Sequence, residues 1–188
     1  MLKAIIDETT SAVVAAVKGV DDIFSAITGT VKNQVVNVLR GAGEVGSTAV
    51  ESIASVASGA IKGAGEVGAS TTDTASNTIT GVVRGASEVG TSVIDAVRGG
   101  VQGVVQATAE TGGDVGGAAV SAVQSAIKSA GEAGANTTEA TKAAVGGALD
   151  AASSVGGDAA STVREALLST ASLPRDVVES VIKGSDKK

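Results

Sequence analysis

The sequence predicts an all-α protein, built from 22-residue repeats as a very long amphipathic helix or a helical hairpin that packs side by side in an oligomer. First, the phrase GAGEVG begins at residue 41 and recurs, identical or varied, every 22 residues along the chain. Second, 22 residues in six helical turns is about 3.67 residues per turn, a period that keeps one helix face on one side over a long distance. Third, the apolar residues are mostly Ala, Val, Ile and Leu, which suit a shallow, smooth contact surface.

The composition excludes several classes of function. The 188 residues include no Cys, no His, no Trp and no Tyr, and only one Phe, one Met and one Pro. Without His or Cys, the Ser/His/Asp and Cys/His catalytic arrangements cannot form, and the commonest metal ligands are absent. A net charge of -6 argues against nucleic acid, which attracts basic surfaces. We therefore expect no enzymatic activity, cofactor, metal, nucleic-acid partner or small-molecule substrate.

The first 18 residues already follow the repeat, so we expect no separate N-terminal domain. Val13 and Val17 occupy apolar positions of the frame, and Lys18 occupies its basic position. Asp7 and Glu8 precede the first apolar run without a distinct basic segment, which is not typical of a signal peptide. The chain has no uncharged apolar run of about 18 residues, so we expect no transmembrane helix. These features favour a cytoplasmic location, with membrane or granule association as an alternative.

The apolar residues occupy fixed positions of the 22-residue frame and step along it by three and four. At roughly 98° per residue they fall within an arc of about 130°, as in a helix that buries one face. A strand would instead require alternation by two. The stripe that we expect to face another helix or a lipid surface includes Ile61, Val67, Ile79, Val83, Val89, Val101, Val105, Val123, Ile127, Val145 and Leu149.

Charged residues form two further columns opposite this stripe. A basic residue such as Lys62 or Arg84 is followed four residues later by an acid, here Glu66 or Glu88. This order gives a weak pair within a helix, about 0.2 to 0.3 kcal/mol. We interpret the charged columns as a solvated face.

Glycine is the unusual feature, because each of the 26 glycines costs about 1 kcal/mol relative to Ala inside a helix. One column lies inside the apolar arc and contains Gly46, Gly68, Gly90, Gly112, Gly134 and Gly156. A second set on its flank pairs glycines four residues apart, such as Gly59 with Gly63. Small residues at this spacing let another backbone approach closely. The pattern predicts a groove for a neighbouring helix; the alternative is a low-complexity chain that is disordered alone.

Two glycine clusters are candidate turns. Gly112, Gly113, Gly116 and Gly117 surround Asp114, and a second cluster spans 99–103. Either could reverse the chain into a hairpin. The unbroken 22-residue phase across both clusters favours a continuous helix, because a reversing loop usually disturbs the register.

The clearest boundary lies near the end of the sequence. Ser172 and Pro174 suggest a cap followed by an early helical proline. We expect a repeat rod over residues 1–170 and, within 171–188, a short helix from about Pro174 to Ile182 with a solvated tail.

The period, the KGAGEVG-type phrases and the basic-then-acidic spacing resemble 11- and 22-residue amphipathic helical proteins. These include apolipoproteins, perilipin-like lipid-droplet coats, bacterial phasins and some late-embryogenesis-abundant proteins, and right-handed hendecad coiled coils share the same arithmetic. The resemblance implies a non-enzymatic protein with an extended interface.

Two functions therefore compete. In the first, copies pack through the Val/Ala/Gly stripe into a bundle, filament or sheath. In the second, the protein coats or remodels a membrane, lipid droplet or polymer granule. The glycine columns favour assembly, because close helix contact offsets their cost and a lipid surface does not.

Overall fold

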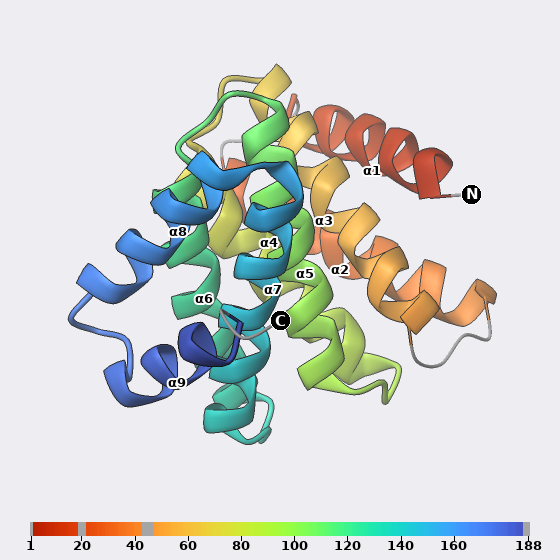
Figure 1. Ribbon diagram of the computed structural model, residues 1–188. Helices are drawn as coiled ribbons and strands as arrows, with labels where there is room; N and C mark the ends of the chain where they lie inside the picture. Colours follow the sequence, from red (N-terminus) through yellow and green to blue (C-terminus); the bar gives the residue numbers. More distant parts are fainter. Residues whose placement is uncertain (1, 19–21, 43–46, 186–188) are drawn as a thin grey trace.

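The structure is a computed structural model, which describes residues 2–18, 22–42 and 47–185 and shows helices joined by turns in these ranges, with no strand (Figure 1). The predicted all-α class is confirmed, but the very long helix is wrong. The helices are Leu2–Val17 (α1), Ile23–Ala42 (α2), Ser47–Glu66 (α3), Thr71–Glu88 (α4), Val93–Glu110 (α5), Val115–Glu132 (α6), Thr137–Val155 (α7), Gly157–Ser169 (α8) and Arg175–Ser185 (α9).

The helices form two layers, because each helix packs most extensively on the second helix along the chain. One layer contains α1, α3, α5 and α7, with α9 on α7, and the other contains α2, α4, α6 and α8. Figure 1 shows α1, α3, α5 and α7 following one another across the molecule in the order of their colours. Hydrogen bonds from Thr10 to Gly59 and from Thr28 to Asn77 both join residues 49 apart. This constant separation means that helices of one layer run parallel.

The repeat length follows from the size of one helix and one link. Helices α4, α5 and α6 have 18 residues each, and four residues separate α4 from α5 and α5 from α6, which adds to 22. The chain therefore reverses once in every repeat. The 22-residue register is kept across each reversal because the link is itself part of the repeated sequence.

Glycines end these helices by adopting a left-handed backbone. Gly90 has a φ of 71°, its N–H donates to the carbonyl of Ser87 at 3.2 Å, and the N–H of Thr91 donates to the carbonyl of Ala86 at 3.0 Å. This pair of bonds is the Schellman motif, in which glycine is favoured because it lacks Cβ. Gly68, Gly112 and Gly134 have φ values of 73°, 71° and 77° and make the same two bonds.

A polar side chain two residues after each of these glycines starts the next helix. Ser92 accepts a hydrogen bond from the backbone N–H of Asp95 at 3.2 Å, and Asn136 accepts from Glu139 at 3.1 Å. Each cap contributes about 1 kcal/mol to helix stability. The cluster around Asp114 is such a link, whereas the cluster at 99–103 lies in the middle of α5. The preference for a continuous helix across Asp114 is therefore corrected.

The core consists almost entirely of Ala, Val, Ile and Leu. One buried cluster centres on α1, α2 and α3, and a second extends from α3 to α9 through residues such as Ile79, Val101 and Leu167. At the end of the chain, α8 stops at Ser169 and α9 follows Pro174, burying Val178 and Ile182. The chain covers its apolar stripe with its own helices.

Candidate binding grooves between helices of one layer

The predicted interface residues separate into a core set and a turn set. The core set is at most 3% exposed and comprises Ile61, Ile79, Val83, Val101, Val105, Val123, Val145 and Leu149. Ile127, Val67 and Val89 are half-buried, the last two at helix ends. The turn set comprises Gly68, Gly90, Gly112, Gly134 and Gly156, which all have positive φ. Gly46 lies outside the described residues.

Close helix contacts are instead made by glycines on the flank of the stripe. A Cβ added to Gly59 would lie 2.6 Å from the carbonyl oxygen of Ile6, and one added to Gly99 would lie 2.5 Å from that of Val50. Gly147 approaches the carbonyl of Arg98 in the same way, at 2.6 Å. These glycines let each helix of the layer pack against the previous one, so their partner is the same chain.

The charged columns form ion pairs between neighbouring helices of one layer. Lys62 Nζ lies 2.8 Å from Glu110 Oε2, and Arg98 Nη2 lies 2.7 Å from Asp150 Oδ2. The hydrogen bond from Lys62 holds the pKa of Glu110 below its ordinary value. No such pair joins Lys62 to Glu66 within the described part of the chain, so the predicted pairing along one helix is replaced by pairing across the layer.

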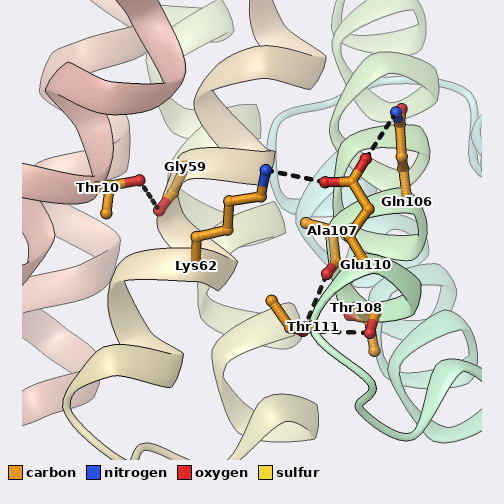
Figure 2. A network of polar contacts seen from close by, with 8 residues as sticks. All are labelled: Thr10, Gly59, Lys62, Gln106, Ala107, Thr108, Glu110 and Thr111. Carbon is orange, nitrogen blue, oxygen red and sulfur yellow. Dashed lines mark hydrogen bonds and ion pairs between the residues drawn. The ribbon is translucent and has the colours of Figure 1, made fainter. Parts of the chain in front are cut away.

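The first concave region, here called the α3 groove, runs along α3 between α1 and α5. Its volume is about 250 Å³. It is lined by Leu2, Ile6, Glu51, Ala54, Ser55, Ser58, Lys62, Gln102, Gln106 and Glu110. Figure 2 shows Lys62 of α3 and Gln106 of α5 reaching Glu110, and Thr10 of α1 joined to Gly59 of α3.

The polar groups of the α3 groove differ in how far they are already paired. Both oxygens of Glu110 are used, one by Lys62 and the other by the Gln106 amide at 3.2 Å. Glu51 forms no ion pair with any described residue, and the Gln102 side chain has no hydrogen bond within the same ranges. Gln102 and Gln106 are not among the predicted interface residues; their only sequence signal is a spacing of one helical turn.

The second concave region, here called the α4–α6 groove, lies on the other layer. Its volume is about 300 Å³, and its lining is Ser76, Thr80, Arg84, Ser121, Gln124, Ser125, Lys128, Ser129 and Glu132. The hydroxyl of Ser125 donates to the carbonyl of Ser76 at 2.8 Å and lies 3.1 Å from the hydroxyl of Thr80. These hydroxyls hold α4 and α6 together, so the groove floor is part of the helix contact.

Comparison with known proteins supports the two-layer arrangement. A crystal structure of the de novo designed helical repeat protein DHR7 is similar over 98% of this chain and 96% of that one, with 18% sequence identity and a TM-score of 0.53. This chain has a helical repeat fold. At this identity the similarity concerns the fold alone. No protein-family model and no curated protein matches the sequence.

Polar side chains line most of both grooves, and Leu2 and Ile6 form an apolar part of the α3 groove. Hydroxyls, amides and single charged groups line them, and the described residues contain no group of three or more His, Cys, Asp or Glu side chains placed to hold a metal ion. None of the helices in the described ranges is both long and apolar enough to cross a bilayer.

Proposed function

We propose that this protein is a non-enzymatic structural scaffold, in which a self-contained helical-repeat body presents two polar layers to its surroundings. The observation that carries this proposal is that the chain itself buries most of the apolar stripe and leaves the rest half-buried. Among the described residues, the only large apolar side chains that are exposed are Leu2, at 40%, and Val155, at 45%. A protein that assembles or binds lipid through its apolar residues normally leaves a larger patch exposed.

The absence of His and Cys from the sequence supports a non-enzymatic role. The carboxylates of the grooves lie beside Lys or Arg side chains, amides and hydroxyls, whereas acid–base catalysis needs a group that titrates near the operating pH, held against a second reactive group. The net charge of -6 supports a partner other than nucleic acid.

Assembly into a filament and coating of a lipid surface are finer hypotheses that the sequence raised. Both use the Val/Ala/Gly stripe as an outward surface. In this fold, flank glycines such as Gly59 and Gly99 already contact α1 and α3, and Val101 is fully buried. Either function would therefore first require the helices to separate. The scaffold proposal requires no such opening.

Sedimentation velocity and far-ultraviolet circular dichroism on the full chain test the proposal. We expect a monomer with high helical content that stays constant from low to high micromolar concentration. Adding phosphatidylcholine vesicles containing phosphatidylserine should change neither measurement. Helical content that rises with protein concentration, together with large particles, would favour filament assembly. Helical content that appears only with vesicles would favour the lipid coat.

A further inference from the structure

We propose that the α3 groove binds an extended peptide segment that carries a Lys or Arg side chain, with Glu51 as the group that pairs with the cation. Three features of the groove favour such a ligand: its shape, the balance of its hydrogen-bond donors and acceptors, and the position of its apolar residues. Peptide binding would be a function beyond the scaffold role, and it would need only the surface that the folded chain already presents.

The shape of the groove fits a short extended chain. Its floor is the stretch of α3 from Glu51 to Lys62, and its walls come from α1 and α5. The eleven steps along the helix from Glu51 to Lys62 span about 16 Å at 1.5 Å per residue. An extended segment rises about 3.3 Å per residue, so about five residues would lie along the floor.

The middle of the floor, between Glu51 and Lys62, is low because Ala54, Ser55 and Ser58 have small side chains. Ser55 and Ser58 are each 6% exposed, although they lie on the side of α3 that faces the groove. The neighbouring helices rise above them because Gly59 lets α1 pack close to α3. A peptide backbone can therefore approach α3 without displacing a bulky residue.

The unpaired polar groups favour a ligand with many hydrogen-bond donors and a positive charge. Lys62 is neutralised by Glu110 at 2.8 Å, whereas Glu51 has no ion-pair partner within the described ranges. The Gln102 amide is also unused there and can both donate to and accept from a peptide backbone. The net charge of the unpaired groups in the groove is therefore negative.

The apolar wall gives the segment an orientation. Leu2 and Ile6 of α1 line the groove together with Glu51, at the N-terminal end of the α3 floor. Leu2 is 40% exposed, one of the two large apolar side chains exposed in the described ranges. The aliphatic stem of a Lys or Arg can cover such a surface while its charged head reaches a carboxylate. A cationic residue is thus expected at this end of the bound segment.

Fluorescence anisotropy with the full-chain protein tests the proposal. The probe is a fluorescein-labelled pentapeptide, Val-Lys-Val-Lys-Val, and the comparison peptide replaces both lysines with glutamate. We expect the lysine peptide to bind and the glutamate peptide not to bind at the same low ionic strength. Glu51→Gln should weaken binding by up to about fivefold, the range for one exposed ion pair.

Two variants locate the site. Gln102→Ala should also weaken binding, because it removes a hydrogen-bonding group from the α5 wall. Glu165→Gln removes an exposed carboxylate of α8, in the other layer and outside both grooves, and should leave binding unchanged. Circular dichroism confirms that each variant is folded before the titration.

Three results would overturn the proposal. The lysine peptide fails to bind, or both peptides bind equally, or Glu165→Gln reduces affinity as much as Glu51→Gln. The last result would mean that the peptide is attracted by the overall charge of -6 and by no particular groove.

Discussion

The contact of α2 with α4 and the contact of α4 with α6 are equivalent by repeat position but differ in chemistry. Gly81 and Gly85 of α4 pack on α2, and 44 residues later, two repeats on, Ser125 and Ser129 of α6 pack on α4. At the glycines the helices approach so closely that a Cβ on Gly81 would lie 2.7 Å from the carbonyl oxygen of Thr28.

At the serines, the helices are joined by hydrogen bonds. Ser125 donates to the carbonyl of Ser76, and Ser129 donates to Thr80 at 3.4 Å. The same repeat frame therefore supports either a close contact between backbones or a hydrogen-bonded contact between side chains. The repeat sets the geometry of the layer, whereas the residue at each contact determines how the stability of that contact responds to substitution.

The largest effect is expected for Gly81→Ala. The added methyl group would meet the rigid backbone of Thr28 and the Cβ of Val31, which lies 2.9 Å away. Overpacking of this kind costs about 1 to 3 kcal/mol of unfolding free energy. Urea denaturation followed by circular dichroism measures it. Gly29→Ala is the matched control, because nothing lies within 4 Å of the added atom in the same helix pair. It should leave stability unchanged or raise it, and an equal loss in both variants would contradict the close-contact account.

A glycine that ends a helix should respond differently from one that packs. Gly90→Ala places a side chain on a backbone with a φ of 71°, although nothing lies within 4 Å of the added Cβ. Left-handed geometry costs about 1 to 2 kcal/mol for a residue with Cβ. Gly90→Asn should lose less stability than Gly90→Ala, because Asn tolerates this left-handed conformation better. If both variants are as stable as the parent chain, the helix does not end at Gly90.

At the hydrogen-bonded contact, Ser125→Ala should lower the unfolding free energy by less than Gly81→Ala. The methyl side chain fits the space, and the variant loses only the bonds to Ser76 and Thr80. We expect a decrease of about 1 kcal/mol in unfolding free energy. A loss as large as that of Gly81→Ala would show that the two contacts do not differ in kind.

A gain is expected for Thr78→Val in α4, the helix shared by both contacts. The hydroxyl of Thr78 is buried and has no hydrogen-bond partner among the described residues, unlike that of Thr80. Replacing it with a methyl group of similar size removes an unsatisfied polar group and should stabilise the fold by about 1 kcal/mol. A higher melting temperature confirms the prediction, and a lower one would mean that the hydroxyl is bonded in solution.

The smallest effect concerns the ion pair between Lys62 and Glu110. The pKa of Glu110 is lowered in the folded state, chiefly by the hydrogen bond from Lys62, so its contribution is present above the unfolded pKa and is lost as pH falls through the folded pKa. The Glu110 side chain is 44% exposed, so we expect no more than about 0.5 kcal/mol. Glu110→Gln should be less stable than the parent at pH 7 and equal to it at pH 3. A difference that persists at pH 3 would assign the effect to packing.

Much of the helix content and the composition of the core could be predicted from the sequence, because Val83, Val101 and Val123 recur at helical spacing. The helix ends could not be predicted from the period, because 3.67 and 3.6 residues per turn differ by only about 30° over 18 residues. A short helix and a long one therefore share the same pattern. The decisive signal was local: Gly90 followed by Ser92 and Asp95 ends one helix and caps the next.

The grooves were harder to predict for a different reason. The α3 groove is lined by three helices of one layer and the α4–α6 groove by two, and residues that meet there are about 49 apart in the sequence. A column of the 22-residue frame contains Lys62 but not its partner Glu110. Without the positions of the turns, the sequence cannot show which columns face each other.

Small-angle X-ray scattering of the dilute monomer tests the central claim that the chain folds back on itself in every repeat. A compact chain of this length has a radius of gyration of about 16 Å, and an elongated two-layer repeat should stay below about 25 Å. A continuous helix over the same residues would extend about 280 Å and give a radius of gyration of about 80 Å. We predict the smaller value; the larger one would contradict the account.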